Sequence, residues 1–331
     1  MATLGIGVLG LRMGRNWANA FAADERSHLA AVYDPNEERT AEVVGELGGE
    51  SCASWQALVE RDDVDVVVVA SPDAFHAEQA IAAFEAGKHV IIEKPMVVTM
   101  EQCETVVAAA DAAGTLGMSG YVLRQSPLGR KLKALVDAGG LGEVFYAEGH
   151  YLVNFHFDTQ PDSWRSSVEH RHWPLLGSAC HVIDLLSWLV GRISEVSCYA
   201  NAMCYTPEQY SFWDCQVAAC TFATGAIGRV LSAYGPVFPH ENRYRLFGRK
   251  ATYDGYTERL YRTEHDWEPF VPDEADTKGN AVAGEADEFL RCLAAGEQPE
   301  MDIRNGAYVA AVALAAEESI RTKQPVAVRQ F

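Results

Sequence analysis

The chain has 331 residues, of which 48% are hydrophobic and 22% charged, and this predicts a soluble globular protein large enough for two domains. Asp and Glu number 46 against 27 Lys and Arg, so the formal net charge is −19 and nucleic-acid binding is not expected. The apolar run Ile6–Leu11 is too short to cross a bilayer, so no membrane association is expected either. The eight cysteines are scattered, with no C-x-x-C pair, which indicates reduced thiols in a cytoplasmic protein.

Residues 1–121 alternate between β-branched runs and helical stretches rich in Ala and Glu. The run Val66–Val69 is wholly apolar, as in a strand that helices cover on both faces. The alternation predicts an α/β fold with a doubly wound, parallel Rossmann sheet over residues 1–121. Strands are expected at Leu4–Leu9, Leu29–Tyr33, Val64–Ala70, His89–Glu93 and Leu116–Gly120, and helices at Met13–Ala23, Asn36–Leu47, Ala74–Ala86 and Met100–Ala113.

From residue 122 to residue 331 longer strands follow one another, with one strong helix at Ser178–Leu189. This order predicts a second, α+β domain over residues 122–331, with an antiparallel or mixed sheet. The acidic stretch 266–284 is expected to be a surface loop, and the final helix, Ile303–Thr322, to pack near the domain junction. A connecting helix is expected at Ser126–Ala138, and strands at Glu143–Val153, Glu195–Tyr205, Cys215–Phe222, Gly225–Ser232 and Val326–Val328.

A glycine turn, Gly10-Leu11-Arg12-Met13-Gly14, follows the first expected strand and opens the first helix. Glycine lets the backbone turn tightly and approach a pyrophosphate, which then lies on the helix N-terminus. The turn departs from G-x-G-x-x-G, because Arg12 stands near the place of the middle glycine and the turn is one residue shorter. A purely structural turn is the alternative. Its place at the start of a strand–helix unit favours a dinucleotide site formed by Gly10, Leu11, Arg12 and Met13.

Asp34 closes the second strand, 24 residues after Gly10. A carboxylate at this spacing binds the adenosine ribose hydroxyls and repels a 2′-phosphate, so we expect NAD rather than NADP as cofactor. The alternative, compatible with this role, is that Asp34 is the N-cap of a helix that begins at Pro35. Arg12 is the nearby residue that would tolerate a phosphate.

Two segments carry a family resemblance: Val69–His76, with Ser71, Pro72 and His76, and Ala86–Met96, which contains Glu93-Lys94-Pro95. Together they resemble the signature of the Gfo/Idh/MocA oxidoreductases, and the similarity extends over essentially the whole chain. The resemblance implies a sugar, cyclitol or related polyhydroxy compound as substrate. It also implies a second domain built on a large, mostly antiparallel open sheet, whose exposed face makes a homodimer or homotetramer.

The resemblance also assigns roles to individual residues. Lys94 is expected to bond the reacting oxygen and Glu93 to contact the nicotinamide ribose, while His181 is the expected acid–base residue. Asp184, three residues after His181, shares its helix face and is its expected partner. The chain departs from the family at Gly177, where relatives often carry an aspartate four residues before the histidine. The remaining expected cofactor contacts are Ala70, Ser71, Pro72 and His76, and the expected substrate contacts are Arg124, Asn154, His156, Trp164 and Arg165.

Some residues have competing interpretations. Trp164 offers an apolar face to a sugar ring and is equally typical of a core tryptophan, and His181 has the alternative of a satisfied core histidine. His170 and His172 form an H-x-H pair, but no second pair of metal ligands is evident, so we interpret them as part of a solvated polar loop and expect no metal. Two other functions fit the same fold: a regulator that binds NAD(P) without turnover, and an eliminase or glycosidase that uses tightly held NAD.

Overall fold

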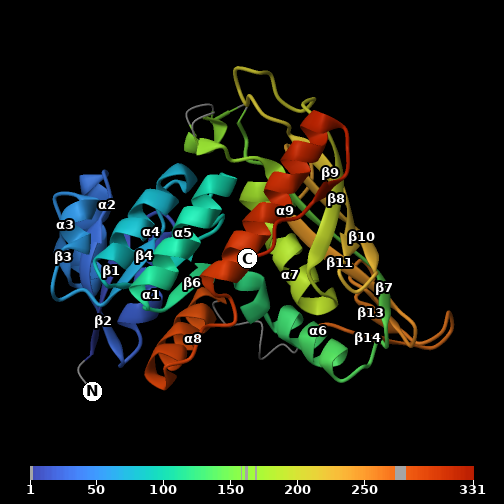
Figure 1. Ribbon diagram of the computed structural model, residues 1–331, viewed down its shortest axis with the longest axis horizontal. Helices are drawn as coiled ribbons and strands as arrows, with labels where there is room; N and C mark the ends of the chain where they lie inside the picture. The colour runs from blue at the N-terminus through green and yellow to red at the C-terminus, as the bar shows by residue number, and fades with distance from the viewer. Residues whose placement is uncertain (1–2, 158, 161–162, 168–169, 273–280) are drawn as a thin grey trace. The chain divides into compact units, whose positions relative to one another are not determined.

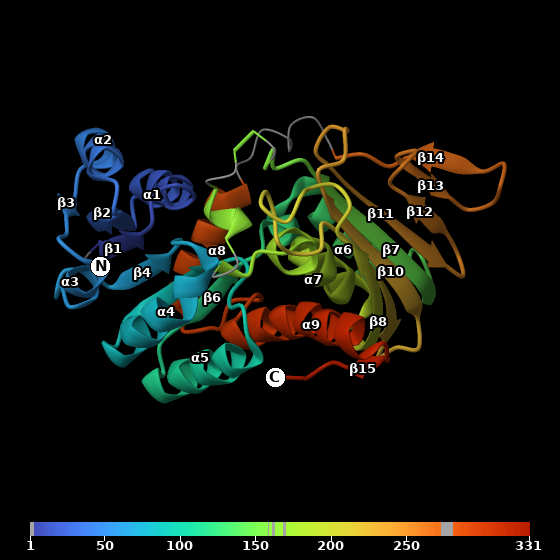
Figure 2. The same cartoon turned by 90° about the horizontal axis from the view of Figure 1, so that it is seen from above.

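The computed structural model describes residues 3–157, 159–160, 163–167, 170–272 and 281–331. The chain forms two compact units (Figures 1 and 2). Unit 1 consists of residues 1–122, 280–307 and 331, and unit 2 of residues 123–279 and 308–330.

Unit 1 is built on a six-stranded sheet in the order β3-β2-β1-β4-β5-β6, in which every neighbouring pair is parallel. Helices α1 and α2 lie on one face, and α3, α4 and α5 on the other (Figure 2). This is the predicted doubly wound Rossmann sheet. Its strands are β1 (Leu4–Leu9), β2 (Ser27–Tyr33), β3 (Glu50–Ser51), β4 (Val66–Val69), β5 (His89–Glu93) and β6 (Gly117–Gly120). Its helices are α1 (Gly14–Ala22), α2 (Glu37–Leu47), α3 (Trp55–Val59), α4 (His76–Glu85), α5 (Met100–Ala113) and α8 (Ala281–Ala295).

Burial explains why the periodicity of unit 1 predicts its strands. All four residues of β4 are fully buried, as expected for a central strand covered by helices on both faces. Trp17 and Phe21 of α1 are fully buried too, and their rings stack with centroids 6.1 Å apart. The sequence did not predict β3 or α3. Both elements are short. The local sequence signal for α3 is its N-cap, Ser54, whose side chain accepts a hydrogen bond from the Ala57 N–H.

Unit 2 is built on a nine-stranded sheet in the order β14-β13-β12-β11-β7-β10-β9-β8-β15. The central pair β7–β10 is parallel and the other neighbours are antiparallel, so the sheet is mixed and mostly antiparallel, as predicted. The strands are β7 (Val144–Val153), β8 (Ile193–Asn201), β9 (Cys215–Phe222), β10 (Ile227–Tyr234), β11 (Glu241–Gly248), β12 (Thr252–Asp254), β13 (Arg259–Tyr261), β14 (Trp267–Pro269) and β15 (Val326–Ala327).

The helices of unit 2 are α6 (Pro127–Asp137), α7 (Cys180–Val190) and most of α9 (Ile303–Thr322), and they lie on one face of the sheet (Figures 1 and 2). Helix α7 packs closely on the sheet where Val182 lies over Gly149 of β7, since a Cβ at residue 149 would lie 2.6 Å from a Val182 methyl group. A π-helical turn, Pro174–Ser178, precedes α7. Over the described residues no helix covers the opposite face of the sheet.

The expectation of one loop over 266–284 is wrong at both ends. Strand β14 occupies Trp267–Pro269, and helix α8 begins at Ala281. Residues 273–280 lie outside the described part of the chain. Strands β11 to β13 were not predicted either, because charged residues facing solvent interrupt their apolar pattern. The predicted limits of β9 and α9 are confirmed.

Candidate active site

The glycine turn after β1 packs against the turn after β4. Gly10 has φ +82°, and a Cβ built on it would lie 2.6 Å from the Ala70 carbonyl oxygen and 2.7 Å from Ser71 Cα. A Cβ on Gly14 would lie 2.7 Å from a methyl group of Val8. Helix α1 therefore begins close to the ends of both strands, and Met13 at its N-cap makes no side-chain capping bond. This glycine cradle and helix N-terminus fit a pyrophosphate.

Asp34, at the end of β2, is tied to this turn. Its Oδ2 accepts hydrogen bonds from the Leu11 N–H at 2.7 Å and from Arg39 Nη1 at 2.9 Å, and its Oδ1 accepts from the Asn36 N–H at 2.9 Å. The N-cap interpretation of Asp34 is wrong. Asn36 caps α2, and its side chain accepts from the Arg39 N–H at 2.8 Å. Sequence reasoning did not identify Arg39, which places a guanidinium beside the carboxylate expected to hold the ribose.

The turns after β4 and β5 are joined through a buried imidazole. His76 Nε2 lies 2.8 Å from the Ser71 carbonyl oxygen, and His76 Nδ1 lies 2.9 Å from the Pro95 carbonyl oxygen. The Ser71 hydroxyl donates to Gln79 Oε1 at 2.7 Å. His76 thus links the turn that carries the expected cofactor contacts Ala70, Ser71 and Pro72 to the turn after β5.

Glu93 and Lys94 stand at the carboxyl end of β5, the edge at which ligands bind in open parallel sheets. Glu93 is buried, and its Oε1 accepts the indole N–H of Trp17 at 2.8 Å. Its Oε2 accepts the Lys94 backbone N–H at 3.1 Å. Gly120 of β6 leaves room for this pair, since a Cβ there would lie 3.3 Å from the Trp17 ring. Lys94 itself is half-buried, and the Lys94–Pro95 peptide is cis. Sequence reasoning missed Trp17, which holds Glu93 in one orientation.

In unit 2 the structure brings together two residues to which the sequence gave separate roles. Arg124 Nη2 donates to Asp184 Oδ1 at 2.5 Å, and Arg124 Nε lies 3.0 Å from both Asp184 oxygens. Asp184 is 0% exposed and Arg124 9%. The Trp188 ring lies under the guanidinium, 5.4 Å from its carbon. Arg124 was expected to hold substrate and Asp184 to orient His181. In the structure the two side chains bind each other in a buried ion pair.

His181 lies in the first turn of α7 and is buried against the sheet. Its ring stacks on Tyr151 of β7 with centroids 6.1 Å apart and planes 21° apart. The His240 ring also packs on Tyr151, with ring centroids 4.8 Å apart. No local sequence pattern indicated Tyr151 or His240, because these ring contacts depend on how α7 crosses β7.

The expected substrate contacts after β7 gather around a cluster of aromatic rings. Asn154 Oδ1 accepts hydrogen bonds from the Tyr205 hydroxyl at 2.9 Å and from the His156 N–H at 2.8 Å. The Arg165 guanidinium lies over the Trp164 ring, 4.6 Å from its centroid. The rings that surround these residues belong to Phe155, Phe157, Tyr205, Tyr210, Phe212 and Tyr234.

The solvated-loop interpretation is wrong for His172, which is 2% exposed and packed edge-on against Trp164 at 5.3 Å. The same imidazole explains why residue 177 is glycine. A Cβ on Gly177 would lie 2.4 to 2.6 Å from three atoms of the His172 ring, so no side chain fits there while His172 is in place.

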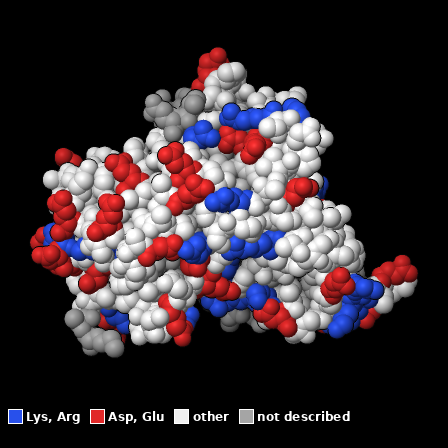
Figure 3. Space-filling view, viewed as in Figure 1, with Lys and Arg blue, Asp and Glu red and all other residues white. Residues whose placement is uncertain are grey.

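No group of three or more His, Cys, Asp or Glu side chains is placed to hold a metal ion within the part of the chain described. Acidic and basic side chains are interspersed over the face shown in Figure 3. None of the described helices combines the length and the apolar character needed to span a bilayer.

Comparison with known proteins gives the family of both parts of the chain. Residues 4–121 match the oxidoreductase family with an NAD-binding Rossmann fold, GFO_IDH_MocA, and residues 130–254 match the GFO/IDH/MocA C-terminal domain. Levoglucosan dehydrogenase from Pseudarthrobacter phenanthrenivorans is 32% identical over 221 residues, which are 63% of this chain and 56% of that protein. The chain thus spans just over half the length of this curated relative.

Two further relatives match over nearly their whole length. The scyllo-inositol 2-dehydrogenase (NAD(+)) of Bacillus subtilis is 25% identical over 98% of this chain and 95% of its own. A structure of levoglucosan dehydrogenase in complex with NADH superposes with a TM-score of 0.89 at 25% identity, covering 99% of this chain and 100% of that one. The chain belongs to the Gfo/Idh/MocA family of oxidoreductases, and its unit 1 has that family's NAD-binding Rossmann fold.

Proposed function

We propose that the protein is an NAD-dependent oxidoreductase that transfers hydride between nicotinamide and a C–OH or C=O group of a sugar, cyclitol or related polyhydroxy compound. The observation that carries the proposal is the Glu93-Lys94 pair at the carboxyl edge of the parallel sheet, with the Glu93 carboxylate fixed by Trp17. Relatives named as dehydrogenases of levoglucosan and scyllo-inositol support the substrate class.

In this proposal unit 1 holds the cofactor. The glycine turn Gly10–Met13 and the N-terminus of α1 hold the pyrophosphate, Asp34 the adenosine ribose, and Glu93 the nicotinamide ribose. A Cβ at residue 10 would collide with the Ala70–Ser71 backbone, so glycine lets the two turns meet where a dinucleotide would bind. Bound NAD⁺ supplies the acceptor for the hydride.

The chain's own groups handle the proton. The Lys94 ammonium donates a hydrogen bond to the reacting oxygen, and His181 accepts the hydroxyl proton in the oxidation and returns it in the reduction. The buried Arg124–Asp184 pair then acts as a support for α7 and His181, since its groups already bind each other at 2.5 to 3.0 Å. Asn154, Trp164 and Arg165 line the part of unit 2 that receives the polyol.

The proposal is tested by following NADH absorbance with the wild-type chain, NAD⁺, and a panel that contains levoglucosan, scyllo-inositol and common hexoses. Steady NADH formation with at least one compound is expected. A chain that binds NAD⁺ but forms no NADH with any of them would be a sensor, and a cleaved product without net NADH would indicate elimination or hydrolysis. Either result would contradict the proposal.

Cofactor choice is expected to depend on Asp34 and its partner Arg39. Asp34→Ser removes a negative charge beside the ribose and releases the guanidinium now 2.9 Å from Asp34 Oδ2. We expect the ratio of kcat/KM for NADP⁺ to that for NAD⁺ to rise at least about tenfold, because like charges placed side by side cost several kcal/mol. Asp63→Ser is the matched control, since Asp63 pairs with Arg61 on an exposed loop. An unchanged ratio would remove Asp34 as the selector.

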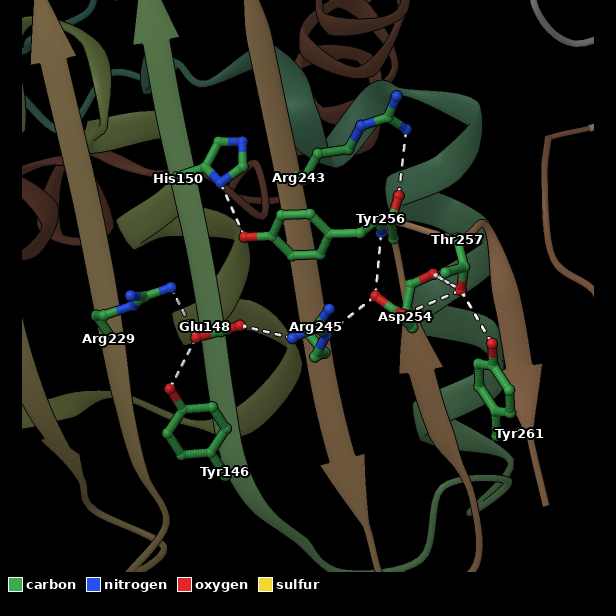
Figure 4. Close-up of polar contacts among 11 residues, drawn as sticks. Tyr146, Glu148, His150, Arg229, Arg243, Arg245, Asp254, Tyr256, Thr257 and Tyr261 are labelled. Atoms are coloured by element: carbon green, nitrogen blue, oxygen red, sulfur yellow. Dashed lines mark hydrogen bonds and ion pairs between the residues drawn. The ribbon is translucent and has the colours of Figure 1, made fainter. Parts of the chain in front are cut away.

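We further propose that the helix-free face of the unit 2 sheet binds a second copy of the chain. Tyr199 and Ile227 are 77% and 57% exposed there. Next to them lies a polar network in which Glu148 bonds Arg229, Arg245 and the Tyr146 hydroxyl (Figure 4). Burial and then the Glu148 carboxylate raise the pKa of Tyr146 to about 12, so its hydroxyl stays a donor.

The second-copy proposal predicts a dimer or larger assembly in multi-angle light scattering. A Tyr199→Arg change is expected to reduce the mass to that of a monomer, because it replaces an exposed aromatic side chain of the helix-free face by a charge. Val237→Arg, between β10 and β11 and fully exposed, is the control. A wild-type chain that is monomeric at every concentration would contradict the proposal.

A further inference from the structure

The space beside Gly177 is filled by His172, a second buried histidine that has no part in the mechanism proposed above. A Cβ on Gly177 would lie 2.4 Å from His172 Cε1 and 2.5 Å from Nε2, so the imidazole occupies the volume of any side chain at position 177. Gly177 lies in the π-helical turn and precedes His181, in the first turn of α7, by four residues. We infer that His172 is a second proton-carrying group of the substrate site, acting with His181. The inference rests on the proposed function.

The two imidazoles lie on the same face of the sheet. His181 stacks on Tyr151 of β7, and His172 stacks on Tyr234 of β10, with centroids 5.9 Å apart and planes 17° apart. In the parallel β7–β10 pair Tyr151 lies opposite Ser232, so Tyr151 and Tyr234 are two residues out of register on neighbouring strands. The Tyr234 hydroxyl contacts Ser178 Oγ at 3.1 Å, directly before α7. Both tyrosines therefore face α7, and both histidines rest on them.

His172 is also held in one orientation. Its ring meets Phe155 and Trp164 edge-on, with centroids 5.8 and 5.3 Å away. Its carbonyl oxygen accepts the Tyr210 hydroxyl at 2.6 Å, and burial raises the pKa of Tyr210, which keeps that hydroxyl a donor. A ring fixed by packing on several sides is preorganised, so it presents the same edge to each substrate molecule.

An imidazole at this place has a chemical use. When a substrate O–H bond breaks, its proton passes to a ring nitrogen and its electron pair forms the C=O bond, while the hydrogen of the adjacent C–H bond would leave with both bonding electrons as hydride to bound NAD⁺. His172 would thereby give the substrate site a ring nitrogen that can take this proton besides those of His181. Titratable side chains that the described ring contacts place around the two histidines include Tyr151, Tyr210, Tyr234, His170 and His240.

The test separates chemistry from packing with five variants. His172→Phe keeps an aromatic ring but removes both nitrogens, and it is expected to lower kcat about 10- to 100-fold with NAD⁺ binding unchanged. Gly177→Asp alone is expected to lower the unfolding midpoint, because its side chain collides with the imidazole. Gly45→Asp is the control for the added charge, since nothing lies within 4 Å of a Cβ at that residue.

The double variant His172→Ala/Gly177→Asp opens the space and puts a carboxylate into it. We expect it to unfold at a higher temperature than Gly177→Asp and to exceed the kcat of His172→Ala at least about tenfold. Because a carboxylate favours protonated His181, the acid limb of its pH–rate profile should move to higher pH.

Three outcomes are distinguishable. An active wild type alongside an unaffected His172→Phe would overturn the inference and leave the proposed function standing. A double variant with neither recovered activity nor a shifted acid limb relative to His172→Ala would overturn it as well. A wild type that turns over no polyol would overturn the proposed function, and the inference with it.

Discussion

Replacing Lys94 by Ala is expected to lower kcat for polyol oxidation about 10²- to 10⁴-fold while NAD⁺ binding stays nearly unchanged. The ammonium would no longer donate to the reacting oxygen as negative charge develops on it. The cofactor contacts of the glycine turn, Asp34 and Glu93 would remain, because Glu93 is held by the Trp17 indole and by a backbone N–H rather than by the lysine side chain. Steady-state kinetics and a fluorescence titration with NADH measure the two quantities separately.

Lys250→Ala is the matched control for this prediction, since Lys250 is an exposed lysine of unit 2 outside the proposed site. It should leave both kcat and cofactor binding at wild-type values. If Lys94→Ala turned over polyols at the wild-type rate, Lys94 would have no part in the chemistry and the proposed mechanism would be wrong.

The second large effect is expected on stability. Asp184→Ala leaves the Arg124 guanidinium buried, 9% exposed, without the carboxylate it now binds through two nitrogens. Removing one partner of a buried ion pair typically costs about 3–5 kcal/mol, because the remaining charge is desolvated and uncompensated. We expect a loss of this size in the free energy of unfolding of unit 2, measured by urea denaturation.

Two variants separate the charge from the packing. Arg124→Met combined with Asp184→Leu removes both charges and should recover most of the loss, since apolar replacement of a buried pair is often neutral. Asp137→Ala breaks the exposed pair with Lys133 and should change stability by no more than about 1 kcal/mol. A double variant as unstable as Asp184→Ala would show that the loss comes from packing rather than from an unpaired charge.

Burial patterns explain which parts of the fold were predictable. In unit 1 the strands are covered on both faces, so runs such as Val66–Val69 are apolar throughout and stand out from the sequence. In unit 2 one sheet face is open, and strand β11 alternates Arg243 and Arg245 with its buried residues Tyr244 and Leu246. Alternation over so few residues resembles a loop, which is why β11 to β13 were not predicted. Strand β14 was not predicted because none of its three residues is buried.

Site residues were predictable where a local pattern carries the signal. The glycine turn and Glu93-Lys94 are contiguous in sequence and lie at the strand ends where they were expected. Trp17 binds Glu93 across 76 residues and Arg124 binds Asp184 across 60, so neither contact leaves a local pattern. Gly177 was visible as a departure, but its cause, the His172 ring, depends on a loop path that spacing does not encode.

Transfer of deuterium from substrate to cofactor tests whether the protein moves a hydride. Levoglucosan and scyllo-inositol deuterated at their ring carbons are incubated with the wild-type chain and NAD⁺, and the cofactor is then analysed by mass spectrometry. Hydride transfer predicts reduced cofactor that carries one deuterium for each ketone formed from at least one of the two compounds. Cofactor that remains oxidised and unlabelled with both compounds would contradict the proposed hydride transfer.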